Sequence, residues 1–194
     1  MLAESINPFR VLFVCTGNIC RSPLAEQLLN HHALILGLPL EVSSAGTQAQ
    51  MGADIPQEVS LVAASLSFQF AAHQPRQLTD EMIHSANLVL TGERSHRAEV
   101  ASRVPSASRK TFTLNQFGRL ATEFGERDDY SKPDNLLELV QEIADFRAIA
   151  TPLNDPRDDD VIDPYRKPLA VYEASGQHIS RCIDSLVFSI QHLA

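Results

Sequence analysis

Residues 11–26, VLFVCTGNICRSPLAE, decide how this chain folds. Val11–Val14 is a short apolar run stopped by Thr-Gly-Asn at 16–18, which is typical of a buried strand in a parallel sheet. Ser22 followed by Pro23 predicts the N-cap and the first position of a helix. The stretch therefore predicts a strand, a tight loop and a helix in direct succession.

The same alternation of strand and helix continues along the chain. Further strands are predicted at Leu40–Ser44, Asn87–Thr91 and Thr111–Leu114. Helices are predicted at Gln57–Leu66, Ser95–Val104, Asn115–Phe124, Leu136–Phe146 and Leu169–Leu193. Alternating elements and right-handed crossovers predict an α/β fold: one four-stranded parallel sheet in the order 2-1-3-4 with helices on both faces. The 15–22 loop should then lie at the carboxyl edge of the sheet.

The length of 194 residues and the hydrophobic content of 44% suggest a single domain. The net charge is −8, and residues 123–163 hold 13 acidic and 4 basic residues, or −9, so the rest of the chain carries about +1. Nucleic-acid binding is disfavoured because the concentrated charge has the wrong sign. We interpret residues 123–160 as an acidic extension of the domain that forms an insertion or a mobile flap.

Several features favour a cytoplasmic protein with no membrane segment. No run of about 18 apolar residues is present. The N-terminus has Glu4 and Pro8 where a signal peptide would carry basic and then apolar residues. Three cysteines make a poor disulfide framework, and Cys15 and Cys20 flank a glycine turn. The seven histidines are scattered, so neither a metal site nor a cofactor is expected.

The loop between the first strand and its helix has the chemistry of a phosphate site. Its backbone N–H groups and the helix dipole converge on one point. Cys15 opens the loop, and the planar guanidinium of Arg21 closes it and matches two phosphate oxygens. These surroundings favour the thiolate form of the cysteine. The loop residues between and after them are Thr16, Gly17, Asn18, Ile19, Cys20 and Ser22.

Residues 11–26 resemble the signature of the low-molecular-weight protein tyrosine phosphatases. Further blocks resemble the family in the same order, namely VSSAGT at 42–47, HQPRQLT at 73–79, NLVLTGERSHR at 87–97, residues 111–117 and Asp163-Pro164-Tyr165. The resemblance implies hydrolysis of phosphotyrosine in proteins through a cysteinyl-phosphate intermediate. It makes Cys15 the nucleophile, Arg21 the phosphate clamp and Asp163 the general acid.

Other roles also depend on the resemblance. From the residues alone, the general acid could be any of the aspartates at 158–160 or Asp163. The family pattern pairs Asn18, which suits a left-handed backbone, with Ser44 and His73 in a hydrogen-bonded support for the loop. Tyr165 would wall the slot that receives an aromatic ring.

Three alternatives and one regulatory question stay open. An arsenate reductase uses the same kind of loop but needs relay cysteines, and beyond the loop this chain offers only Cys182. A phosphoarginine phosphatase resembles this loop with Thr in place of Ile19, whose apolar side chain favours a flat aromatic substrate. A phosphopeptide-binding module would be expected if the nucleophile or the acid were missing. Cys15 and Cys20 could also form a reversible disulfide.

Overall fold

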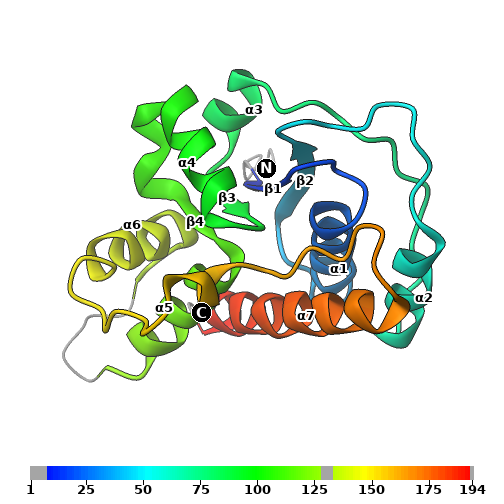
Figure 1. Cartoon of the computed structure of the whole chain (residues 1–194). Coiled ribbons are helices and arrows are strands. Elements are labelled where there is room, and N and C mark those ends of the chain that lie inside the picture. Colours follow the sequence, from blue (N-terminus) through cyan, green and yellow to red (C-terminus); the bar gives the residue numbers. More distant parts are fainter. Residues whose placement is uncertain (1–7, 128–132, 193–194) are drawn as a thin grey trace, which may run out of the picture.

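The computed structural model describes residues 8–127 and 133–192 and forms an α/β fold (Figure 1). Four parallel strands lie in the order β2-β1-β3-β4, as the sequence predicts. Their bounds are β1 Phe9–Cys15, β2 Leu40–Gly46, β3 Leu88–Thr91 and β4 Thr111–Thr113. The long helices are α1 Arg21–Leu36, α2 Gln57–Ser65, α4 Arg94–Arg103, α5 Leu114–Gly125, α6 Leu136–Phe146 and α7 Leu169–Gln191.

Successive residues of β1 serve two separate cores, because side chains of a strand alternate between the faces of the sheet. Val11 and Phe13 pack with α1, α2, α5, α6 and α7 on one face. Leu12 and Val14 pack on the other face with α4 and with the short helix α3, Asp80–Ser85. The two-faced cover explains why β1 is buried along most of its length.

Three details differ from the sequence prediction. The helix predicted to start after Ser22 begins at Arg21, so Ser22 is not the N-cap; Cys20 holds that position, and the Ser22 hydroxyl is used inside the site. Helix α3 was not predicted, although Thr79 caps it by accepting a hydrogen bond from Met82 N. Two short 3-10 helices, η1 Pro105–Lys110 and η2 Pro156–Asp159, were also missed.

The acidic segment 123–160 contains an ordered helix. One face of α6 is buried in the core that also contains α5 and α7, through side chains that include Ile143 and Phe146. The segment from η2 to α7 then crosses the carboxyl edge of the sheet (Figure 1). Residues 128–132 of the predicted extension and the last predicted helical residue, Leu193, lie outside the described residues. Among the described helices, none is both long and apolar enough to cross a membrane.

Candidate active site

Cys15 ends β1 at the carboxyl edge of the sheet, and residues 16–20 loop back to the start of α1. The next segment holds this loop from outside: Thr47, Gln48 and Gln50 donate their backbone N–H groups to the carbonyls of residues 15, 16 and 17, at 2.9 to 3.0 Å. We infer that the N–H groups of the loop are thereby left facing inward, where an anion would accept them.

Two backbone positions make this tight loop possible. Asn18 has a φ of 55°, in the left-handed region that asparagine tolerates better than most residues. At Gly46, which is paired with Cys15 in the sheet, a Cβ atom would lie 2.5 Å from the backbone oxygen of Thr16. Any other residue at position 46 would therefore push the loop out of place.

The fully buried side chain of Asn18 connects the loop to its support. Its Nδ2 donates to the hydroxyl oxygens of Ser44, at 2.8 Å, and Ser22, at 2.9 Å. Its Oδ1 accepts from the backbone N–H of Arg76, at 2.8 Å, and lies 3.2 Å from Nε2 of His73. The structure thus brings Ser44 and His73 to the residue with which the sequence analysis pairs them.

The Cys15 sulfur lies 3.0 Å from the Ser22 hydroxyl. Because Asn18 already donates to the Ser22 oxygen, the hydroxyl proton is available to the sulfur. A hydroxyl that donates to a thiolate stabilises its negative charge. Cys20 is different: burial first, and then the neighbouring Cys15, raise the pKa of Cys20 to about 12, so this thiol stays protonated at neutral pH. Both cysteines are free thiols in the structure.

Arg21 is only 4% exposed, yet it meets charged groups on both sides. Nη1 contacts the Glu93 carboxylate and donates to the backbone oxygen of Val161 at 3.1 Å, and Nη2 lies 3.3 Å from the Asp163 carboxylate. Burial alone would lower the pKa of Arg21, but Cys15 and then Glu93 outweigh burial and raise the pKa. The guanidinium is therefore a permanent positive charge beside the cysteine.

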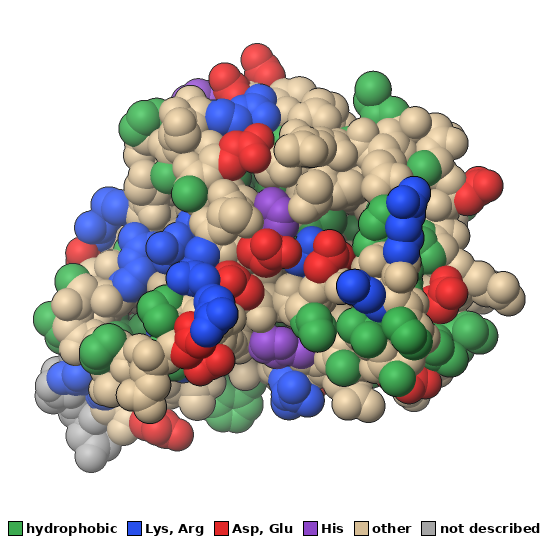
Figure 2. Space-filling model, in the orientation of Figure 1, with side chains coloured by type: hydrophobic (Ala, Val, Ile, Leu, Met, Phe, Trp, Pro, Cys, Tyr) green, Lys and Arg blue, Asp and Glu red, His purple; other side chains and the backbone are tan. Residues whose placement is uncertain are grey.

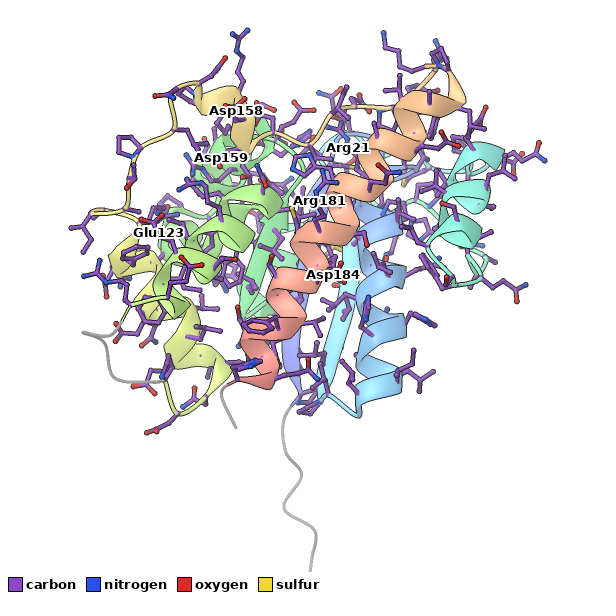
Figure 3. The ribbon with its side chains drawn as sticks, turned by 90° about the horizontal axis from the view of Figure 1, so that it is seen from below. Arg21, Glu123, Asp158, Asp159, Arg181 and Asp184 are labelled. Carbon is purple, nitrogen blue, oxygen red and sulfur yellow. The ribbon has the colours of Figure 1, made fainter. Side chains whose placement is uncertain are left out.

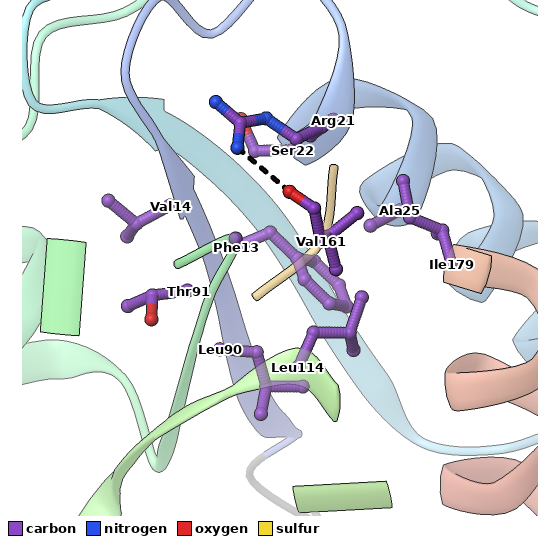
Figure 4. A pocket seen from close by; sticks show the side chains of 11 residues that line it. Phe13, Val14, Arg21, Ser22, Ala25, Leu90, Thr91, Leu114, Val161 and Ile179 are labelled. Atoms are coloured by element: carbon purple, nitrogen blue, oxygen red, sulfur yellow. Dashed lines mark hydrogen bonds between the residues drawn. The ribbon is translucent and has the colours of Figure 1, made fainter. Parts of the chain in front are cut away.

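The segment that carries Asp163 is anchored over the site. Val161 N donates to the backbone oxygen of Gly92 at 2.8 Å, while its carbonyl accepts from Arg21 (Figure 4). The Val161 side chain is buried and lines a small internal cavity of about 10 Å³ together with Phe13 and Leu114. This packing fixes the backbone two residues before Asp163.

The four aspartates that the sequence leaves open have different surroundings. Asp160 is held by the guanidinium of Arg94 through both carboxylate oxygens, at 3.1 to 3.2 Å. Asp159 is buried 3.6 Å from Arg119, and its pKa is raised by that burial. Asp158 lies on η2 and, like Asp159, is at the same end of the molecule as Arg21 (Figure 3). Asp163 is half exposed and contacts Arg21 directly, which places it beside the Cys15 loop.

Tyr165 lies beside the loop. Its hydroxyl donates to the side-chain oxygen of Gln50 at 3.1 Å, and Gln50 packs against Gly17 of the loop. The Arg166 guanidinium sits 5.0 Å from the centre of the Tyr165 ring. An aromatic wall at this position is compatible with a flat ring entering the site.

Sequence reasoning missed two residues of the site, Glu93 and His96. Both lie at the start of α4, far along the chain from the loop, within the block NLVLTGERSHR. His96 is buried, its Nε2 lies 2.8 Å from the Thr16 hydroxyl, and its Nδ1 has no hydrogen-bond partner. Burial, and then Arg21, lower the pKa of His96, so the imidazole is neutral at pH 7. The pattern of charges in the sequence could not have identified His96, because His96 meets the loop through a hydrogen bond.

We expect His96→Ala to lower kcat/KM about fivefold to tenfold, because Thr16 loses the partner that fixes the loop. Thr16→Val should cause a similar loss, and the double variant should be no worse than either single variant. Steady-state kinetics of the three variants measures this coupling. Fully additive losses would contradict a shared role for the pair.

Comparison with known proteins agrees with this geometry. Residues 10–155 match the family described as low molecular weight phosphotyrosine protein phosphatase. The chain is 32% identical to a protein-arginine-phosphatase of Geobacillus stearothermophilus, over 95% of this chain and 97% of the relative. It is 34% identical to the low molecular weight protein-tyrosine-phosphatase Etp of Escherichia coli K12, over 67% of this chain and 83% of the relative. A low molecular weight protein tyrosine phosphatase from T. tengcongensis superposes with a TM-score of 0.67 at 30% identity, over 93% and 98%.

Proposed function

Because the chain belongs to the low molecular weight phosphotyrosine protein phosphatase family, we propose that it removes phosphate from tyrosine side chains of proteins, with Cys15 as the nucleophile. In the first step the Cys15 sulfur attacks phosphorus in line, the bond from phosphorus to the phenol oxygen breaks, and Asp163 protonates that oxygen. In the second step Asp163 takes a proton from water, which attacks phosphorus and releases inorganic phosphate and the free cysteine.

The observation that carries the proposal is the direct contact of Arg21 with Asp163 beside the Cys15 loop. It supports a division of labour in which the guanidinium binds two phosphate oxygens and the carboxylate faces the leaving group. The contact of Arg21 with Glu93 orients the guanidinium from the other side. Binding, attack and protonation are each assigned to a side chain of this protein, so none of these steps calls on a metal or a cofactor.

The choice of phosphotyrosine over phosphoarginine depends on Ile19. Its side chain is 4% exposed and packs in the apolar core beside the loop. It has no polar atom to accept a hydrogen bond from the N–H groups of a phosphorylated guanidinium, and leaving such donors unpaired in a closed site is costly. An aromatic ring makes no such demand. Phosphoarginine is the second candidate, because a relative that matches 95% of the chain is named a protein-arginine-phosphatase.

A substrate panel tests the assignment. Phosphotyrosine, phosphoarginine and phosphoserine peptides of equal length should be compared by kcat/KM, with arsenate and thioredoxin as a separate arm. The proposal expects phosphotyrosine to be hydrolysed fastest and arsenate not to be reduced. Faster release from phosphoarginine would move the assignment to the second candidate.

Ile19→Thr should raise the ratio of kcat/KM for phosphoarginine over phosphotyrosine about tenfold, because a hydroxyl supplies the missing acceptor. The matched variant is Ile19→Val, since valine has the shape of threonine without the hydroxyl. The comparison of these two variants separates the hydrogen bond from the change in volume. If both variants give the same ratio, position 19 does not select the substrate.

A further inference from the structure

A hollow with an arginine-rich lining lies between α4, β4 and α6. Its volume is about 520 Å³, and its lining includes Arg97, Ser108, Thr111, Gln116 and Arg147; we call it the arginine hollow. Figure 2 shows Lys and Arg side chains gathered over these elements, on the face of the molecule that carries the carboxyl ends of the strands. The α4 side of the hollow adjoins the Cys15 site, because the backbone N–H of Arg97 donates to the backbone oxygen of Glu93, whose side chain contacts Arg21.

The two arginines of the hollow have no carboxylate of their own. Arg97 donates from Nη1 to the side-chain oxygen of Gln116 at 2.6 Å, and the amide of Gln116 in turn lies 3.5 Å from Asp159. Neither Arg97 nor Arg147 forms an ion pair in the part of the chain that the structure describes. Asp159 itself is already engaged by Arg119.

Arg147 is a fixed charge rather than a mobile one. It donates to the backbone oxygens of Thr111, at 3.1 Å, and Ser108, at 3.3 Å, and its guanidinium lies 4.7 Å from the centre of the Phe112 ring. Burial first, and then the positive charges of Arg97 and Arg109, lower the pKa of Arg147. Of these two neighbours, Arg109 is exposed and is paired with Asp145 at 2.7 Å.

This local excess of positive charge lies in a chain whose net charge is −8, and it would attract an acidic group. We propose that the arginine hollow binds an acidic side chain of the phosphoprotein substrate while the phosphorylated residue occupies the Cys15 loop. Arg97 is the group that contacts the carboxylate, because within residues 8–127 and 133–192 its guanidinium makes one hydrogen bond, to Gln116, and its other N–H groups are available. Arg147 adds positive electrostatic potential from a fixed position. A pair of arginines also binds a carboxylate with better geometry than a single lysine would. This inference rests on the proposed function.

The test uses phosphotyrosine peptides of one length, with two glutamates or two glutamines at successive positions on either side of the phosphotyrosine. For the unaltered protein, the best acidic peptide should have a KM roughly fivefold below that of its glutamine counterpart, with similar kcat. The advantage should disappear in Arg97→Gln and in the charge reversal Arg109→Glu. Arg109 is exposed and its positive charge acts on Arg147, so its replacement changes the charge near the hollow without disturbing the core, even if Arg97→Gln folds poorly.

The matched control is Arg103→Gln, on the same helix but paired with Asp80 away from the hollow, and it should keep the preference. Turnover of a small aryl phosphate reports on the Cys15 centre separately. Equal KM values for acidic and neutral peptides at every position would overturn the inference, as would a preference that survives both variants. Failure of the unaltered protein to hydrolyse any phosphotyrosine peptide would instead count against the proposed function.

Discussion

Cys15→Ser is expected to lose essentially all turnover, a fall of about 10⁴-fold or more, while still binding phosphate or vanadate. The serine hydroxyl has nearly the shape of the thiol but is not ionised at neutral pH, so the cradle stays and the nucleophile is lost. The loss should appear in kcat rather than in the inhibition constant for vanadate. Steady-state kinetics on a phosphotyrosine peptide, with vanadate as inhibitor, measures both.

Cys182→Ser is the control for this variant. Cys182 is buried on α7, and its sulfur lies 3.6 Å from the side-chain oxygen of Asn115, which would accept a bond from a hydroxyl. Its replacement should leave kcat within about twofold. Retention of turnover by Cys15→Ser, or an equal loss in Cys182→Ser, would refute the nucleophilic role of Cys15.

Asp163→Asn should slow the first step on phosphotyrosine by about 10²-fold or more, because the amide cannot supply a proton to the leaving oxygen. The tyrosine phenol has a pKa near 10 and is a poor leaving group without that proton. An aryl phosphate with a much more acidic phenol should be slowed far less in the same step. Single-turnover measurements on both substrates separate this step from the later hydrolysis of the intermediate.

Asp158→Asn is the matched control, since Asp158 belongs to the same segment but neither contacts Arg21 nor is held by Arg94, as its neighbour Asp160 is. Equal slowing of the two substrates by Asp163→Asn in the first step would show that another group is the acid. Loss of activity in Asp158→Asn would then direct attention to η2.

The sequence could predict the parts of the fold that depend on local pattern. Val11–Val14 is apolar on both faces of a strand, and the strand order follows from this burial and from crossovers of fixed hand. The position of Cys15 at the carboxyl edge follows from the same pattern. These features needed no knowledge of distant contacts.

The errors arise where tertiary contacts override local preference. Serine is a preferred N-cap residue. The hydroxyl of Ser22 nevertheless lies between Cys15 and Asn18, and the helix starts one residue earlier. Glu93 and His96 meet the loop only because β3 lies beside β1, a contact that no local pattern reports. The aspartates likewise differ only in their surroundings: Arg94 pairs with Asp160, and Asp159 is buried. The sequence Asp-Asp-Asp does not show either difference.

The most direct test of the account is to find where the phosphate is held during turnover. Asp163→Asn should accumulate the intermediate with an activated aryl phosphate, because the leaving group departs unaided while water is not activated. Rapid acid quenching followed by peptide mass spectrometry should locate one phosphate on Cys15. Phosphate on Cys20 or on any other residue, or no phosphorylated protein during a burst of phenol release, would contradict attack by the Cys15 thiolate.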